Sequence, residues 1–268
     1  MPYFATDDHC NLYYEEKGEG DAVVFIHGWS CNRNFYKKQL PEFQSRYKVL
    51  SYDLRGHGDS DRTEYGLTIP HFARDLKELI DYKGYENVTL IGWSMGVYII
   101  FDYIKQFGSD NLSKIVLLDM TSKMVTDDKW SYGLFGNYPL SDAVDYLESI
   151  TVNWNDVAAG FVPTMFDDNY TNKDEIAWIL SEAEKNTPHV MVNMWLSLIQ
   201  QDYRDMLSSI DVPTLITYGT SKSLYEPECS EYIKDNIPGA KILPLHGGHI
   251  SHFEDYKTFN KEVIDFIG

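Results

Sequence analysis

The chain has 268 residues, which is long enough for one large domain with a substantial hydrophobic core. Its formal net charge is −18, from 41 acidic and 23 basic residues. A negative field of this size repels nucleic-acid phosphates and anionic lipid headgroups, so we expect neither nucleic-acid nor membrane binding.

The cysteines give a further indication of the compartment. Cys10, Cys31 and Cys229 are widely scattered and show neither a CxxC pair nor metal-ligand spacing. A sparse, odd set of this kind is typical of a reducing compartment. The first ten residues lack the basic and apolar stretches of a signal peptide, and no apolar run approaches the roughly 20 residues of a membrane span. The sequence therefore predicts a cytoplasmic protein.

Short apolar runs that are typical of strands recur along the chain, with helical patterns between them. Strands are predicted at 3–7, 12–16, 22–26, 49–53, 88–91, 115–118, 214–217 and 240–245. Helices are predicted at 68–82, 94–107, 227–237 and 254–267. Buried strands that alternate with helices indicate the α/β class, with a mainly parallel eight-stranded sheet covered by helices on both faces.

The alternation stops between Met120 and Asp205. Helical patterns follow one another there without a strand between them, at residues 141–150, 173–185 and 190–202. We interpret residues 120–205 as an inserted helical cap, and residues 1–119 with 206–268 as the core. Much of the aromatic content lies in the cap, which suits a lid or a substrate wall, although a tyrosine-rich core and surface would explain it equally well.

A GxSxG motif, Gly92-Trp-Ser94-Met-Gly96, lies where a buried strand ends and a buried helix begins. At such a turn the serine is held in a strained conformation, and the two glycines let neighbouring backbone approach. The hydroxyl then stands at the carboxyl edge of the sheet, above a helix N-terminus that favours developing negative charge. We therefore expect Ser94 to be a nucleophile; the alternative is that it caps the helix.

A serine hydroxyl needs a base, and three histidines near the C-terminus compete for that role. His246 extends the last strand, His252 approaches the last helix, and His249 follows two glycines on the most freely shaped part of the loop. We expect His249 to be the base.

Upstream, Gly28 permits a turn that points backbone N–H groups inward, so the N–H groups of Trp29 and Met95 are predicted to bind an oxyanion.

Four segments of the chain carry a resemblance to a known family. They are the strand followed by His27-Gly28-Trp29, the stretch from Tyr52 to Ser60, the GxSxG turn at Ser94, which we call the elbow, and the Gly-His loop at His249. In their order and spacing they resemble the α/β-hydrolase superfamily. The likeness is strongest to its capped esterases, C–C-bond hydrolases and cofactor-free haloperoxidases, and it covers nearly the whole chain outside the cap. It implies Ser94 as nucleophile, His249 as base, and Trp29 with Met95 as oxyanion donors, without a cofactor or a metal.

One position departs from the superfamily pattern. Its members usually carry the acid of the catalytic triad after the seventh strand, as Gly-x-x-Asp, whereas this chain has Gly219-Thr-Ser-Lys222 there. Some members place the acid at the end of the sixth strand, where this chain has Asp119. We expect Asp119 to be the acid, with Glu226 as its main rival; Asp119 as a cap of the next segment is the structural alternative.

Taken together, these residues predict a serine hydrolase that cleaves small to medium apolar carboxylic esters through an acyl-enzyme. C–C-bond hydrolysis and perhydrolysis use the same residues and remain alternatives. A slow-turnover ligand receptor on the hydrolase fold is the rival from another class, and Lys222 is the feature that favours it. The expected partner is a small-molecule ester, and the expected state is a monomer or a homodimer.

Overall fold

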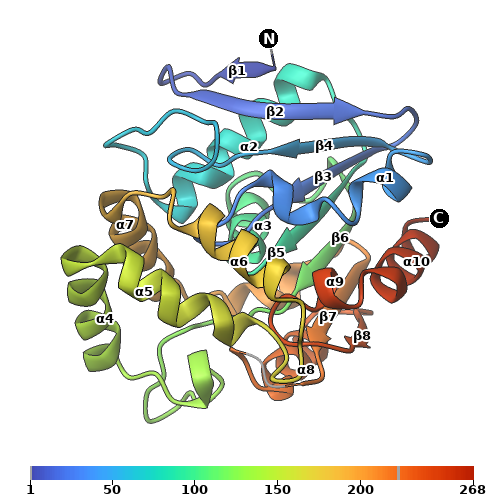
Figure 1. The fold of residues 1–268 in the computed structure, drawn as a ribbon. Coiled ribbons are helices and arrows are strands. Elements are labelled where there is room, and N and C mark those ends of the chain that lie inside the picture. Colours follow the sequence, from blue (N-terminus) through green and yellow to red (C-terminus); the bar gives the residue numbers. More distant parts are fainter. Residues whose placement is uncertain (1, 222–223) are drawn as a thin grey trace.

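A computed structural model describes residues 2–221 and 224–268, which build one eight-stranded sheet with helices around it (Figure 1). The strands of this sheet are β1 (Tyr3–Ala5), β2 (Asn11–Lys17), β3 (Ala22–Ile26), β4 (Lys48–Tyr52), β5 (Val88–Trp93), β6 (Leu112–Leu118), β7 (Thr214–Gly219) and β8 (Lys241–Leu245). All eight predicted strands are present, with ends that differ by a few residues.

The strand order is β1-β2-β4-β3-β5-β6-β7-β8. β1 and β2 join the sheet in antiparallel pairs, and every pair from β4 to β8 is parallel. The central strands β3 and β5 are buried at every position, because helices cover both faces of the sheet. The predicted mainly parallel sheet is therefore confirmed.

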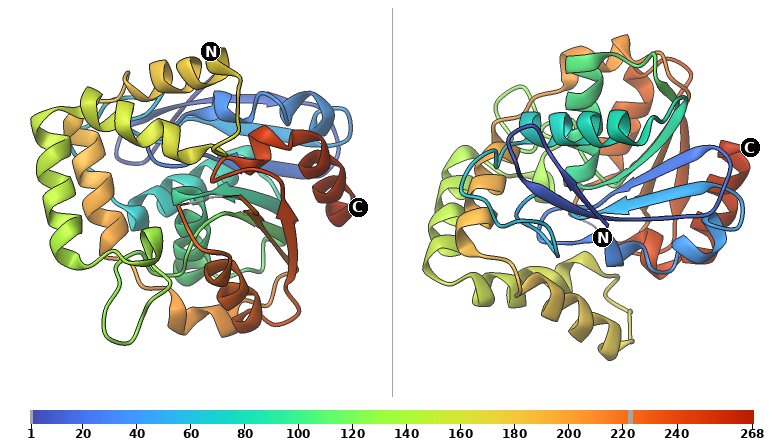
Figure 2. Two further views of the ribbon diagram at one scale, coloured as in Figure 1. Left: turned by 60° about the horizontal axis from the view of Figure 1, so that its bottom comes forward. Right: turned by 90° about the horizontal axis from the view of Figure 1, so that it is seen from above.

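Helices lie on both sides of this sheet, with α1 and α10 on one face and α2 and α3 on the other (Figure 2). The helices outside the cap region are α1 (Leu40–Phe43), α2 (Ile69–Lys83), α3 (Met95–Phe107), α8 (Pro227–Asn236), α9 (Ser251–Glu254) and α10 (Tyr256–Ile267). None of the helices in residues 2–221 and 224–268 is long and apolar enough to cross a membrane.

The segment between β6 and β7 is helical, and its helices gather at one side of the sheet (Figure 1). They are α4 (Leu140–Val152), α5 (Trp154–Phe161), α6 (Lys173–Ala183) and α7 (Pro188–Ile199). Short 3-10 turns complete the chain, at η1 (Arg33–Tyr36), η2 (Leu134–Gly136), η3 (Val162–Met165) and η4 (Arg204–Ser209).

Helix α5 was not among the predicted helices. A single residue, Asn153, separates it from α4. Asn153 takes an extended conformation, and its side chain accepts a hydrogen bond from the N–H of Asp156. A single residue thus ends one helix and caps the next. The predicted helix at 141–150 corresponds to α4, whereas the sequence pattern predicted no helix for the residues of α5.

Candidate active site

Ser94 occupies a strained turn between β5 and α3. Its backbone has φ 54° and ψ −120°, a conformation that non-glycine residues rarely adopt. The Ser94 N–H donates to the carbonyl oxygen of Leu118 at 2.9 Å and so extends the pairing of β5 with β6. Its side chain makes no capping bond to α3, so the hydroxyl is not used as a helix cap.

The two glycines of the elbow allow this turn to sit close to its neighbours. A Cβ atom at Gly96 would lie 2.3 Å from the carbonyl oxygen of Ile26, and one at Gly92 would lie 2.6 Å from the carbonyl oxygen of Gly96. Both distances are shorter than real carbon contacts, so a larger residue at Gly96 would push α3 away from β3, and one at Gly92 would push α3 away from β5. The elbow therefore requires glycine at both ends.

His249 and Asp119 are brought together from segments 130 residues apart. Nδ1 of His249 lies 2.6 Å from Oδ2 of Asp119, and the two residues are only 1% and 2% exposed. A carboxylate can only accept, so Nδ1 carries the proton and Nε2 is the basic nitrogen. Asp119 directly follows β6 with φ 43°, and its N–H donates to the carbonyl oxygen of Thr217 on β7.

The loop that carries His249 is held by bonds to its backbone. The indole Nε1 of Trp93 donates to the His249 carbonyl oxygen at 2.9 Å, and the Gly248 N–H donates to Oε2 of Glu254 at 2.7 Å. Because Trp93 is the last residue of β5, the residue before Ser94 also positions the backbone of the histidine. The backbone segments that carry Ser94 and His249 are thereby linked.

The other two histidines of this loop do not line the pocket at Ser94. His246 is exposed. His252 is buried among Tyr36, Trp93 and Phe259, and neither of its ring nitrogens has a hydrogen-bond partner in the described chain. Burial, the neighbouring His249 and Lys38 lower the pKa of His252 to about 3. It is therefore neutral at pH 7, and no hydrogen bond among the described residues links its ring to the pocket.

The loop after β3 lies against the elbow. A Cβ at Gly28 would be 3.1 Å from Cβ of Ser94, so the backbone of this glycine approaches the serine closely. His27 shapes the loop: its Nε2 accepts from the Leu54 N–H at 3.0 Å and its Nδ1 lies 2.9 Å from the Gly28 carbonyl oxygen. The N–H groups of Trp29 and Met95 donate to no acceptor among the described residues.

Glu226, the rival candidate for the acid, lies in a different environment from Asp119. Glu226 is exposed and precedes α8, and it does not line the pocket that holds Ser94 and His249. Lys222 lies outside the described residues. Within the described chain, Asp119 is thus the carboxylate that meets the imidazole of His249.

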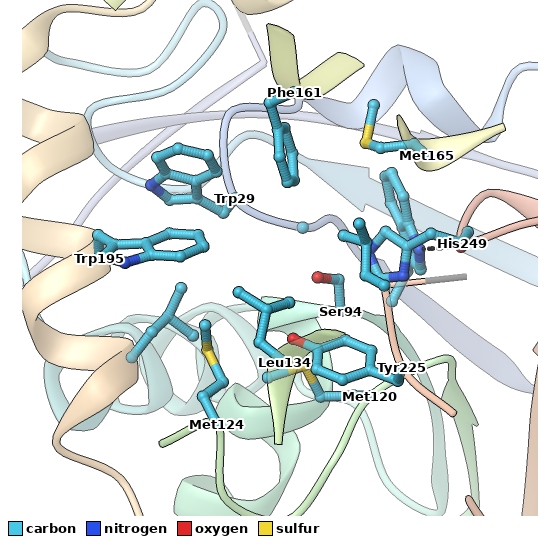
Figure 3. A pocket seen from close by; sticks show the side chains of 14 residues that line it. Trp29, Ser94, Met120, Met124, Leu134, Phe161, Met165, Trp195, Tyr225 and His249 are labelled. Atoms are coloured by element: carbon cyan, nitrogen blue, oxygen red, sulfur yellow. Dashed lines mark hydrogen bonds between the residues drawn. The ribbon is translucent and has the colours of Figure 1, made fainter. Parts of the chain in front are cut away.

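Ser94 and His249 line one small cavity of about 20 Å³ (Figure 3). That volume holds about one water molecule. The remaining wall is almost entirely apolar and comes from both the core and the segment between β6 and β7: Gly28, Trp29, Trp93, Met120, Met124, Leu134, Phe161, Met165, Trp195, Leu198, Leu224 and Tyr225. Ser94 and His249 therefore face a small, mostly apolar pocket, and such surroundings strengthen electrostatic interactions.

Comparison with known proteins now identifies the family. The family described as alpha/beta hydrolase fold matches residues 21–146. A putative non-heme chloroperoxidase from Synechocystis is 30% identical over 305 aligned positions that cover 100% of both chains. The chain belongs to the α/β-hydrolase family.

Two further proteins that are similar to this chain are named as esterases. A bifunctional esterase/perhydrolase from Acinetobacter calcoaceticus is 23% identical, over 100% of this chain and 99% of its own. The solved structure of an esterase from Exiguobacterium antarcticum superimposes with a TM-score of 0.92 at 26% identity, and covers 99% of this chain and 98% of that chain. The resemblance inferred from the motifs is therefore confirmed at the level of the α/β-hydrolase family.

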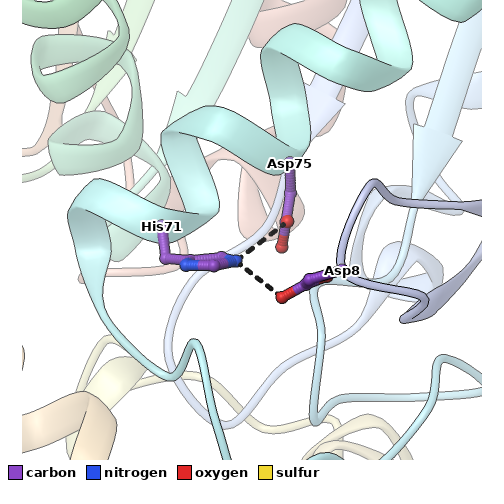
Figure 4. A group of neighbouring side chains, drawn as sticks. All are labelled: Asp8, His71 and Asp75. Atoms are coloured by element: carbon purple, nitrogen blue, oxygen red, sulfur yellow. Dashed lines mark hydrogen bonds and ion pairs between the residues drawn. The ribbon is translucent and has the colours of Figure 1, made fainter.

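One further cluster in this hydrolase resembles a metal site. Oxygen and nitrogen atoms of Asp8, His71 and Asp75 lie within 4.8 Å of one another (Figure 4). The guanidinium of Arg55 already bonds both carboxylates, at 2.7 and 2.8 Å to Asp75 and at 2.8 and 2.9 Å to Asp8. Because a fixed cation takes up the carboxylate oxygens, this group does not fit a metal ion and instead joins the β1–β2 turn to α2.

Several pocket residues of this α/β-hydrolase were not predicted individually. Tyr225 lines the pocket beside His249, and burial together with the nearby Asp119 raises the pKa of Tyr225 well above its usual value, so its hydroxyl is neutral. Leu134, Phe161 and Trp195 come from three separate segments between β6 and β7. The aromatic richness of residues 120–205 was the only sequence signal for them, and it named no position. Ser30 and Cys31, in the loop after β3, do not line the pocket.

Proposed function

We propose that this protein is a carboxylic-ester hydrolase that works through an acyl-enzyme, with Ser94 as nucleophile, His249 as general base and Asp119 as the acid. The observation that carries the proposal is that His249 bonds Asp119 and lines the same pocket as Ser94. Each of the three side chains follows the carboxyl end of a strand or lies in a loop that such a strand positions.

In the proposed reaction, Oγ of Ser94 attacks the ester carbonyl carbon while Nε2 of His249 takes the hydroxyl proton. The backbone N–H groups of Trp29 and Met95 bind the oxyanion that forms. When the bond to the alkoxy oxygen breaks, His249 gives its proton to the leaving alcohol. A water molecule then attacks the acyl-enzyme, again with His249 as base, and the carboxylic acid and Ser94 are released.

Asp119 supports this cycle in two ways. Its carboxylate holds the imidazole in the tautomer that leaves Nε2 basic, and it stabilises the imidazolium that forms when His249 accepts the proton. Because both groups are buried, this interaction is poorly screened by solvent. We place the activity in the cytoplasm, in a monomer or a homodimer, and assign residues 120–205 to a cap that shapes the substrate pocket.

The test compares the unaltered protein with Ser94→Ala. The unaltered protein should hydrolyse a short-chain nitrophenyl ester and should be labelled by a fluorophosphonate. Ser94→Ala should lose both, with an unchanged circular dichroism spectrum. Substantial ester hydrolysis by the folded variant would contradict the assignment, and absence of turnover in the unaltered protein would favour the ligand-receptor alternative.

Perhydrolysis is a second candidate for the same residues. In that reaction hydrogen peroxide replaces water in the attack on the acyl-enzyme, so an ester and peroxide give a peracid and an alcohol. The relative named as a bifunctional esterase/perhydrolase and the one named as a chloroperoxidase favour this candidate. Measuring peracid formation from an acetate ester and peroxide, with Ser94→Ala as control, tests it. C–C-bond hydrolysis has no such observation in its favour.

A further inference from the structure

A second, larger cavity adjoins the one at Ser94. It measures about 350 Å³, against about 20 Å³ for the catalytic cavity. Ligand pockets usually hold about 300–1,000 Å³, so the second cavity has the size of a binding site and the first does not. We call the second one the cap cavity. The residues that line it are Leu134, Phe135, Tyr138, Tyr146, Ser149, Asp156, Val157, Gly160, Phe161, Thr164 and Trp195.

Three residues line both cavities and form the wall between them: Leu134, Phe161 and Trp195. Trp195 is held firmly, because its Nε1 donates to the Tyr138 hydroxyl at 3.0 Å and its ring packs on Trp29. Leu134 is only 1% exposed, so its side chain is packed by its neighbours.

Phe161 is the least constrained member of this wall. It is half-buried, stands at the end of α5, and its one ring partner within the described chain is Trp29. Rotation of the Phe161 side chain would join the two cavities without displacing a hydrogen-bonded group. Phe161 is therefore placed to act as a gate between them.

The side chains that line the cap cavity suit an uncharged apolar group. Most of its surface comes from aromatic and aliphatic side chains. Burial raises the pKa of Tyr138 to about 12 and that of Tyr146 further, so both hydroxyls are neutral at pH 7. Asp156 at the exposed edge, and the net charge of −18, disfavour an anionic group. A cavity of about 150 Å³ can hold benzene, so this one has room for a ring or a medium alkyl chain.

The position of the base decides which part of an ester would occupy the cap cavity. His249 must give its proton to the leaving alkoxy oxygen, so the alcohol part has to lie on the His249 side of Ser94. Trp195 and Leu134 lie on the other side of Ser94 from His249 (Figure 3). The acyl part therefore points toward the wall that leads to the cap cavity.

Gly160 of α5 is exposed and lines the cap cavity. A glycine inside a helix costs about 1 kcal/mol relative to alanine. No atom lies within 4 Å of a Cβ built at Gly160, so no close approach requires glycine there. Because Gly160 lines the cap cavity, a side chain at this position would instead take up space in it.

We infer that the hydrolase takes neutral esters of short alcohols, whose medium-length or aromatic acyl group passes Phe161 and occupies the cap cavity. This inference rests on the proposed ester hydrolysis at Ser94. It assigns a direction to the substrate, with the small alcohol on the His249 side, and it makes Phe161 and Gly160 determinants of acyl specificity.

Two isomeric esters test the direction in the unaltered protein. Methyl heptanoate and hexyl acetate have the same composition, but only the first has a long acyl group. We expect kcat/KM for methyl heptanoate to exceed that for hexyl acetate at least tenfold, because several methylene groups gain an apolar pocket. Equal values, or a preference for hexyl acetate, would overturn the inference.

Substitutions in α5 test the cavity itself. Gly160→Leu should lower the ratio of the two kcat/KM values at least fivefold. The matched control is Ala159→Leu, an exposed neighbour that does not line the cavity, and it should leave the ratio unchanged. An unchanged ratio in Gly160→Leu would also overturn the inference. If no ester is cleaved, methyl acetate included, the proposed hydrolase function fails; turnover of methyl acetate without a gain from a longer acyl chain overturns only the acyl assignment.

Discussion

The N–H of Ser94 donates to the carbonyl oxygen of Leu118 at 2.9 Å, and Leu118 is the residue before Asp119. The proposed nucleophile and the proposed acid are thus attached to adjacent backbone positions on paired strands. Both residues have positive φ values, 54° for Ser94 and 43° for Asp119. Two strained residues at one sheet edge are typical of a site where geometry is held by the surrounding structure.

Replacing Asp119 with asparagine should reduce kcat about 10³- to 10⁴-fold while KM changes little. The amide keeps the shape of the side chain but can hold the histidine in the wrong tautomer, which has a cost of this size in serine proteases. Steady-state kinetics on a nitrophenyl ester measures the effect. Glu226→Gln is the control and should stay within about threefold of the unaltered protein, because Glu226 is exposed and outside the pocket. The reverse pattern would move the acid to the loop after β7.

Replacing Gly28 with alanine should lower kcat by roughly ten- to a hundredfold. The new methyl carbon would lie 3.1 Å from Cβ of Ser94 and 3.3 Å from the carbonyl oxygen of Trp93, so either the serine or the loop after β3 must shift by a few tenths of an ångström. Small displacements of reacting groups are expensive in rate. Thermal unfolding should show a folded protein, and unchanged kinetics would mean that the loop does not position the reacting groups.

Arg55→Met should destabilise the fold by about 3–5 kcal/mol in urea unfolding. Arg55 is fully buried and bonds both Asp8 and Asp75, so its loss leaves the carboxylate of Asp75 buried without its cation. Lys77→Met is the comparison, because Lys77 pairs with Asp81 on the surface of α2 and should change stability by less than about 0.5 kcal/mol. Similar effects from the two substitutions would show that the buried network contributes little.

The buried histidines should make the fold sensitive to acid. Burial lowers the pKa of His252 to about 3 and that of His57 to about 4, against 6.5 for an exposed histidine. Between these values and 6.5 the unfolded chain binds protons that the folded chain does not, so the free energy of unfolding falls as pH falls through this window. The slope is at most about 1.4 kcal/mol per pH unit for each histidine.

His252→Phe isolates one of these contributions. The phenyl ring suits the aromatic neighbours Tyr36, Trp93 and Phe259, and it removes two ring nitrogens that have no partner in the described chain. Denaturant titrations at pH 4, 5, 6 and 7 should show a shallower pH dependence than the unaltered protein. If the free energy of unfolding keeps the same dependence on pH, His252 binds its proton in the folded chain over the same pH range as in the unfolded chain.

The sequence identified the parts of the site that local pattern determines. The elbow at Ser94 and the loop at His249 both follow short apolar strands and contain the glycines that such turns need, so position along the chain was enough to find them. Asp119 was reached by exclusion, because Lys222 occupied the expected position. Its contact with His249 depends on the pairing of β6 with β7, which strand patterns alone do not specify.

The parts that the sequence did not identify depend on distant packing. Arg55 meets Asp8 across 47 positions of chain, and no spacing rule connects them. The wall between the two cavities joins Leu134, Phe161 and Trp195, each from a different turn or helix of the cap. Helical periodicity shows which residues face inward, but it does not show which inward residues meet, so the cap cavity could only be seen in three dimensions.

The contacts between the histidine loop and the segment between β6 and β7 have a consequence for engineering by segment exchange. The N–H of Ile250 donates to the carbonyl oxygen of Met165, and Glu254, which holds Gly248, also accepts from the N–H of Asp167. Residues 165–167 therefore act as part of the scaffold for the histidine, although they lie inside the inserted segment. A chimaera that takes its lid from a relative should cross over on either side of this stretch and retain it, so that the grafted helices bring a new preference without loosening the base.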